Sequence, residues 1–139
     1  IHQKAEFDGH PEGVEATAEE LEQTLFGDRP LATVLFAEVD GIPVGYALFF
    51  QTYSSFLAQP SLWLDDLFVQ APFRNRGIGT ALIHALTQEA QRRNCGRVEW
   101  TVSAHNPHGI TFYQKINAQV CDDTWLCRKT LETPMVLHA

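Results

Sequence analysis

The sequence predicts an α/β fold in which helices flank a central mixed sheet. Two β-rich runs, residues 31–39 and 42–53, meet at Asp40-Gly41, which is a strong hairpin signal. An apolar run at residues 62–69 is followed by a glycine loop and an amphipathic helix. The alternating run 97–104 then follows at the spacing of a crossover between parallel strands. Antiparallel and parallel strands together make the sheet mixed.

The N-terminal part predicts one clear helix. Residues 1–13 are polar and fit the end of a helix whose start precedes the chain. Residues 17–26 predict a short helix, because Thr17 and Glu20 have the spacing of a capping box, in which each side chain bonds the backbone of the other residue. In the returning strand of the hairpin, Gly45 marks an expected close approach of two backbones.

The central stretch, residues 62–94, predicts an anion site. A strand is followed by a loop with the sequence Arg-Asn-Arg-Gly-Ile-Gly-Thr and then by a helix with Leu82, Leu86 and Ala90 spaced four apart. A helix that begins at a glycine loop directs free N–H groups and its positive dipole end at one place, which suits phosphate. An ordinary turn with solvated arginines is the alternative. The loop lacks the Gly-Lys-Ser/Thr of a nucleotide-triphosphate loop, and Leu82 stands where a dinucleotide fingerprint needs a small residue.

The C-terminal part predicts a helix and further strand. Asn106 and Pro107 are suited to the N-cap and first position of a helix, and Asn117 to a left-handed residue at its end. Residues 120–131 predict one or two strands with a turn at Asp122-Asp123.

Composition limits the class of protein. The 139 residues, 45% of them hydrophobic, suit a single domain spanning residues 1–139. A net charge of -7 disfavours a nucleic-acid partner, and no apolar run is as long as a membrane span. Cys95, Cys121 and Cys127 are odd in number and lack metal-ligand spacing, which predicts free thiols and a cytoplasmic location. His105 and His108 fit a solvated loop better than a metal site.

Several segments together resemble one superfamily. The Arg-x-x-Gly-x-Gly loop after a buried strand and the Asn-Pro-His-Gly-Ile-Thr-Phe-Tyr run are similar to the GNAT N-acetyltransferases. The runs Gly-Tyr-Ala-Leu-Phe-Phe, Leu-Asp-Asp-Leu-Phe-Val and Phe-Tyr-Gln-Lys resemble its diamine branch, the spermidine/spermine and thialysine acetyltransferases. The likeness runs from about residue 3 to Trp125 and implies a GNAT-type acyl-CoA N-acyltransferase fold without its first strand and the start of its first helix.

The resemblance implies a reaction and a set of site residues. Acetyl-CoA would be the co-substrate, no metal would be needed, and the acceptor would be a small cationic amine, namely a di- or polyamine or a lysine analogue. The coenzyme would contact Leu67, Phe68, Val69, Arg74, Asn75, Arg76, Gly77, Ile78, Gly79, Thr80, Asn106, Pro107, His108 and Gly109. The amine would contact Glu6, Asp65, Glu99, Trp100, Thr101 and Asp123, and Tyr113 would be the general acid.

The chemistry of these positions leaves alternatives open. Asp65 could accept the amine proton through water, or only anchor the cation; a structural acid that caps a loop or pairs with an arginine is the other interpretation. Of the two neighbouring aspartates, Asp65 and Asp66, we expect Asp66 to have the structural role. The Tyr113 phenol could protonate the departing thiolate. Trp100 suits a core position better than the amine site, whereas Asp123 suits a turn as well as it suits the amine site. The acids Glu6, Asp65, Glu99 and Asp123 together would favour a polycationic amine.

Two other functions remain possible from the sequence. One is a protein-lysine or amino-acid N-acetyltransferase, which shares the coenzyme site. The other is a non-catalytic acyl-CoA-binding regulatory module, which the presence of both Asp65 and Tyr113 disfavours. By resemblance we also expect a homodimer, and we expect neither a nucleic-acid nor a membrane partner.

Overall fold

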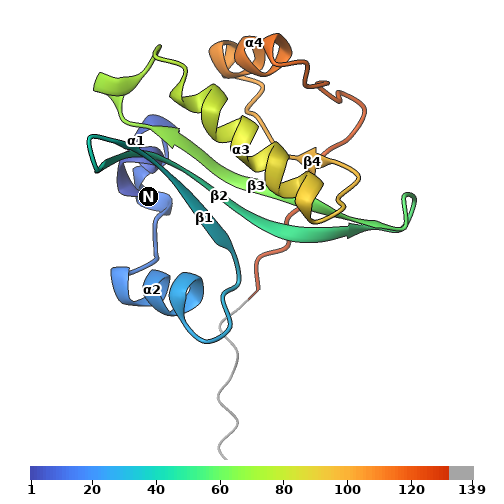
Figure 1. Cartoon of the computed structure of the whole chain (residues 1–139), viewed down its shortest axis with the longest axis horizontal. Helices are drawn as coiled ribbons and strands as arrows, with labels where there is room; N and C mark the ends of the chain where they lie inside the picture. The colour runs from blue at the N-terminus through green and yellow to red at the C-terminus, as the bar shows by residue number, and fades with distance from the viewer. Residues whose placement is uncertain (132–139) are drawn as a thin grey trace, which may run out of the picture. The chain divides into compact units, whose positions relative to one another are not determined.

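The computed structural model describes residues 1–131, which fall into two compact units, one of residues 1–101 and one beginning at Val102. The second unit contains the helix α4 (Pro107–Lys115). The first unit contains, in order, α1 (His2–Phe7), η1 (Pro11–Gly13), α2 (Ala18–Phe26), β1 (Thr33–Val39), β2 (Ile42–Ser54), β3 (Gln59–Val69), η2 (Ala71–Phe73), α3 (Ile78–Arg92) and β4 (Val98–Glu99) (Figure 1).

The four strands form one sheet, which is mixed as predicted and has the strand order β1-β2-β3-β4. The first three strands are antiparallel neighbours, and β4 is parallel to β3. The predicted hairpin turn is confirmed, because Asp40 (φ 51°) and Gly41 (φ 78°) both adopt the left-handed backbone that a type I′ turn requires. At Gly45 an added Cβ would lie 2.7 Å from the carbonyl oxygen of Phe68, so β2 and β3 approach closely there.

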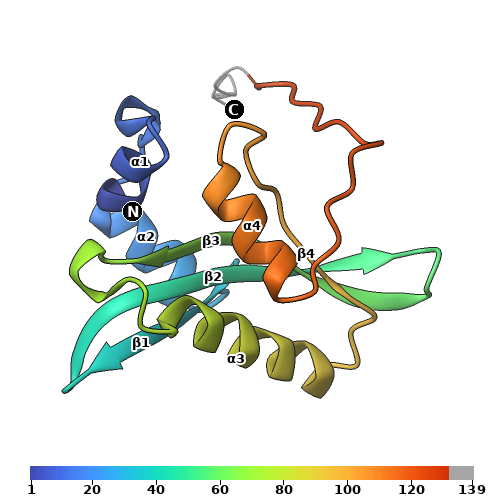
Figure 2. The ribbon, with the colours of Figure 1, turned by 90° about the horizontal axis from the view of Figure 1, so that it is seen from above.

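Two helices lie on opposite faces of this sheet. Leu82, Leu86 and Ala90 of α3 are buried against one face, where they meet Phe49 and Leu62. Figures 1 and 2 show α1 on the other face, where the rings of Phe7 and Phe68 have centroids 6.4 Å apart. The sheet therefore separates the main apolar core from a second, more polar layer under α1.

A β-bulge in β3 was not predicted from the sequence. Leu48 of β2 pairs with Asp66 and its neighbour Phe49 pairs with Leu64, so Asp65 is the extra residue without a β2 partner. The insertion shifts the alternation, and Leu62 and Leu64 before it and Leu67 after it all contact the α3 core. This explains how two aspartates fit inside an apolar strand.

Local signals for helix ends are confirmed. The Thr17 Oγ1 atom accepts a hydrogen bond from the Glu20 backbone N–H at 3.2 Å, and Glu20 Oε2 accepts one from the Thr17 N–H at 2.9 Å. The Asn106 side chain accepts a hydrogen bond from the Gly109 N–H at 3.0 Å, and Asn117 has φ 64°. These caps depend on residues three or four apart, which sequence spacing describes well.

Two predicted strands are wrong in extent. The run 97–104 forms only β4, because strand pairs exist only between Leu62 and Val98 and between Trp63 and Glu99. Residues 120–131 form no strand, and their side chains are exposed. Alternating apolar residues favour a strand only where a neighbouring backbone completes the ladder, and within residues 1–131 these segments have no such partner.

Candidate functional site

The site is built around the edge of β3 that extends beyond its pairing with β4. Because β4 pairs only with Leu62 and Trp63, residues 64–69 of β3 have no strand on the β4 side within the described part of the chain. An extended ligand could hydrogen-bond to this edge as an added strand. The edge includes Leu67, Phe68 and Val69, whose backbone the resemblance assigns to the coenzyme.

The chain continues from this edge into a loop with two left-handed residues. Asn75 has φ 61° and Gly77 has φ 78°, two positions apart, and α3 begins directly afterwards at Ile78. Gly77 is the N-cap and offers no side-chain oxygen. The first helical hydrogen bond runs from the Ala81 N–H to the Gly77 carbonyl at 2.9 Å, so the N–H groups of residues 78–80 have no acceptor in the preceding turn.

These N–H groups lie at the positive end of a 15-residue helix. Left-handed turn residues before such a helix form a backbone concavity that suits a phosphate group. The loop geometry therefore fits the diphosphate expected here. Its Arg76 side chain is exposed and lies with its guanidinium carbon 5.4 Å from the Phe73 ring centroid.

Arg74, which was predicted to add charge at the anion site, also contacts β3 and α1. Its Nε atom donates a hydrogen bond to the Val69 carbonyl at 2.8 Å. Its guanidinium carbon lies 4.4 Å from the Phe7 ring centroid and 5.4 Å from that of Phe68. Arg74 thus connects the loop, the end of β3 and α1, and Arg76 is the more exposed of the two cations.

The two aspartates of β3 have different surroundings. Asp65 is exposed at the bulge. The Asp66 side chain is only 19% exposed and lies 3.3 Å from the Lys4 Nζ atom. The Tyr46 hydroxyl donates a weak hydrogen bond to Asp66 at 3.4 Å. Burial, followed by the charge of Asp66, raises the pKa of Tyr46, so the phenol stays protonated at neutral pH. Asp66 therefore has the structural partners that the sequence analysis expected of it.

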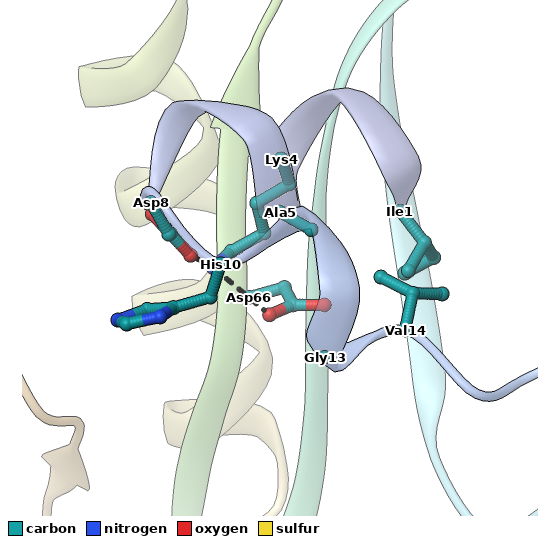
Figure 3. Close-up of a pocket in the computed structure, with 8 residues that line it drawn as sticks. All are labelled: Ile1, Lys4, Ala5, Asp8, His10, Gly13, Val14 and Asp66. Carbon is teal, nitrogen blue, oxygen red and sulfur yellow. Dashed lines mark hydrogen bonds and ion pairs between the residues drawn. The ribbon is translucent and has the colours of Figure 1, made fainter.

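A cavity of about 260 Å³ that is widely open to solvent lies between α1, η1 and β3. Figure 3 shows the side chains of Lys4 and Asp8 turned toward Asp66. The residues that line the cavity are Ile1, Lys4, Ala5, Asp8, His10, Gly13, Val14 and Asp66.

Lys4 and Asp8 were not predicted from the sequence to be site residues. Their spacing of four on a polar segment was the available signal, since such residues meet on one side of a helix. Glu6, which the resemblance assigns to the amine, is exposed on α1 and does not line this cavity.

Three further residues assigned to the amine follow β4 or lie in it. Glu99 is exposed and accepts a hydrogen bond from the Arg97 Nε atom at 3.1 Å. Trp100 is half-buried and packs against the α3 core, as its residue type suggested. Thr101 is exposed. None of the three lines the cavity under α1.

The second unit contains the remaining predicted residues. Asn106 caps α4, Pro107 is its first residue and His108 is exposed. An added Cβ at Gly109 would lie 2.5 Å from the Asn106 side chain, so a larger residue would disturb the cap. Tyr113 is half-buried, with its ring centroid 5.3 Å from that of Phe112. Asp123 is exposed outside regular structure. The roles assigned to these residues stay predictions.

No group of three histidine, cysteine or acidic side chains in residues 1–131 could hold a metal ion. None of the helices in this range combines the length and the apolar character needed to cross a membrane. Cys95, Cys121 and Cys127 are free thiols.

Comparison with known proteins identifies relatives across most of the chain. The sequence profile of the family described as "Acetyltransferase (GNAT) family" matches residues 2–118. L-ornithine N5-acetyltransferase NATA1 of Arabidopsis thaliana is 40% identical over 91 residues, which are 66% of this chain and 40% of that protein. Thialysine N-epsilon-acetyltransferase of Mus musculus is 28% identical over 127 residues, 86% of this chain and 74% of that protein.

A solved structure shows the same fold. An aminoglycoside acetyltransferase from an uncultured soil metagenomic sample superimposes with a TM-score of 0.77 at 18% identity, covering 92% of this chain and 83% of that one.

Proposed function

Because the chain belongs to the Acetyltransferase (GNAT) family, we propose that it moves an acetyl group from acetyl-CoA directly to a primary amine. The acceptor in this proposal is a small di- or polyamine or a lysine analogue. The observation that carries the proposal is the edge of β3 at residues 64–69, which pairs with no strand among residues 1–131 on the β4 side and leads into the left-handed loop at the start of α3. The two features are consecutive in the chain and suit the two halves of one ligand.

The residues present fit coenzyme A. The amide pantetheine arm can hydrogen-bond to an open strand edge such as residues 64–69, and a diphosphate suits the N–H groups of residues 78–80. Arg76 supplies a nearby exposed cation. When bound, acetyl-CoA supplies an activated acetyl thioester.

The proposed acceptor rests on charge and on relatives. Asp65 is exposed at the bulge, and Asp8 and Asp66 line the cavity beneath α1. Carboxylates at these positions suit an amine that carries positive charge. The relatives NATA1 and mouse thialysine acetyltransferase are named for amines on amino acids, ornithine and thialysine. The 40% identity to NATA1 keeps an amino-acid amine as the second candidate acceptor.

Two side chains have proton-transfer roles in the proposal. An alkyl amine with a pKa of about 10.4 is neutral in only roughly one molecule per thousand at neutral pH, so its proton must be removed before attack. Asp65 accepts that proton through water or holds the cation before it is lost. As the N–C bond forms and the C–S bond breaks, Tyr113 donates its phenolic proton to the departing thiolate, and the second proton lost by the attacking nitrogen restores the phenol through water. No cysteine is required as an acyl carrier.

The organisation of the protein is part of the same proposal. The family profile extends over residues 2–118, which supports one N-acetyltransferase domain spanning the chain. The homodimer and the cytoplasmic location stay predictions.

An amine screen tests the proposed function. The purified chain is incubated with acetyl-CoA and single amines, and both the released thiol and the mass of the acetylated amine are measured. We expect thiol release that depends on a small cationic amine, with one acetyl group added per thiol. Tight coenzyme A binding without thiol release from any amine would instead support the non-catalytic module.

A further inference from the structure

Lys4 places an ammonium group between two carboxylates of the first unit. Its Nζ atom forms an ion pair with Asp8 on the same helix and lies 3.3 Å from Asp66 Oδ1 on β3. The side chains of Lys4 and Asp66 are only 18% and 19% exposed. Burial disfavours the Lys4 cation, but the hydrogen bond to Asp8 and the charge of Asp66 outweigh it and raise the pKa of Lys4. Lys4 is therefore charged at neutral pH.

The ion pairs of Lys4 with Asp8 and Asp66 face a cavity. A pair that only joined a helix to a sheet would not need such a space. Lys4, Asp8 and Asp66 all line the same space of about 260 Å³ (Figure 3). That space has room for several waters or for a short alkylamine. The Tyr46 hydroxyl contacts Asp66 from β2, so the carboxylate is held from a second element.

The cavity is next to the bulge that exposes Asp65. Asp66 is the neighbour of Asp65 in β3, and the charge of Asp65 contributes to the raised pKa of Tyr46. An amine whose reacting nitrogen lies at Asp65 could therefore extend a second positive group toward Asp8 and Asp66. In this chain the Lys4 ammonium already occupies that carboxylate pair.

We propose that Lys4 is a specificity-determining residue. Its own positive charge lowers the number of positive charges that the protein prefers on its amine substrate. The inference rests on the proposed acetyl transfer to amines. Lys4 fills the place of one substrate ammonium, so a second or third positive group on the amine adds little affinity. Without Lys4, the two carboxylates would bind such a group.

Replacing Lys4 with a neutral residue of similar length tests this role. Calorimetric titrations of the wild type and Lys4→Met, both saturated with coenzyme A, measure the binding of butylamine, 1,4-diaminobutane and spermidine. Because a charged hydrogen bond contributes about a factor of ten or more in affinity, we expect Lys4→Met to bind spermidine about tenfold more tightly. Binding of butylamine should not change.

Two variants are matched controls. Lys129→Met makes the same change of charge at an exposed position in the second unit and should leave all three affinities unchanged. Lys4→Arg keeps the cation and should behave as the wild type. Equal affinities for spermidine in the wild type and Lys4→Met would overturn the proposal, as would an equal gain for butylamine, which would indicate only a wider cavity.

A third variant keeps the test decisive if Lys4→Met folds poorly. Lys4→Met combined with Asp66→Asn removes one charge of each sign, and it should show the wild-type order of amine affinities. A gain for spermidine in this double variant would contradict the role of Asp66. Because binding and not turnover is measured, failure of the proposed acetyl transfer would appear separately, as an absence of thiol release in the amine screen.

Discussion

The Arg74 Nε atom lies 2.8 Å from the Val69 carbonyl oxygen, which ties the loop before α3 to the last residue of β3. The guanidinium also lies 4.4 Å from the ring centroid of Phe7 on α1. The Arg74 side chain thus connects the end of β3, the loop before α3 and the helix α1 that covers the cavity. The relationship suggests that Arg74 positions the loop and that Arg76 meets the anion.

Removing the Arg74 contact should loosen the coenzyme site. In Arg74→Met the charged hydrogen bond to Val69 is lost, and we expect coenzyme A affinity to fall about tenfold. Calorimetric titration with coenzyme A measures the loss. Arg29→Met makes the same change of charge at an exposed position before β1, and this control should bind coenzyme A as tightly as the wild type does. Equal losses in both variants would mean that only the overall charge matters.

Gly77 offers a test that separates backbone strain from ligand contact. Gly77 and Gly41 have the same φ of 78°, and neither has an atom within 4 Å of an added Cβ. Valine at either position should cost at least about 1–2 kcal/mol of stability, because a left-handed backbone disfavours side chains. Only Gly77→Val should also abolish coenzyme A binding.

Thermal unfolding and calorimetry of both variants provide the comparison. Tight binding of coenzyme A by Gly77→Val would contradict the loop assignment, whatever its stability. Loss of binding in Gly41→Val would show that destabilisation alone explains the result.

Tyr113 should act on turnover rather than on binding. In Tyr113→Phe the thiolate loses its proton donor, and we expect kcat to fall about a hundredfold or more with little change in coenzyme A affinity. Tyr53→Phe removes a hydroxyl from a side chain that is 70% exposed and should leave kcat unchanged. Steady-state kinetics with the best amine supply the measurement. Equal kcat in the wild type and Tyr113→Phe would remove Tyr113 from the proposed reaction.

Asp65→Asn should separate the two roles proposed for this carboxylate. We expect kcat/KM with 1,4-diaminobutane to fall at least about tenfold, because a charged partner or a base is lost. A fall in kcat would identify a base, and a rise in KM with kcat unchanged would identify an anchor for the cation. Asp28→Asn, at an exposed site, is the control. Unchanged kcat/KM for this diamine would exclude either role.

Local sequence signals predicted the elements that depend on neighbouring residues. The Asp40-Gly41 turn, the Thr17 capping box and the Asn106 N-cap are each confirmed, and each involves groups only a few residues apart. The α3 core was also predictable, because Leu82, Leu86 and Ala90 repeat with the helix period.

Features that depend on distant partners were not predictable. The bulge at Asp65 exists only in the register between β2 and β3, which a single strand's sequence does not contain. The pairing of Lys4 with Asp66 joins residues far apart in the chain, and so does the contact of Arg74 with Phe7. The strand predicted in residues 120–131 failed for the same reason, since alternation does not supply a neighbouring strand.

Hydrogen exchange with and without coenzyme A tests the central proposal most directly, because it reports on the backbone N–H groups assigned to the ligand. With coenzyme A at saturation, exchange should slow in peptides covering residues 64–69 and 75–81 and stay unchanged in β1 at the far edge of the sheet. If coenzyme A fails to bind, or binds with exchange in both segments unaltered, the strand edge and the loop do not form the coenzyme site.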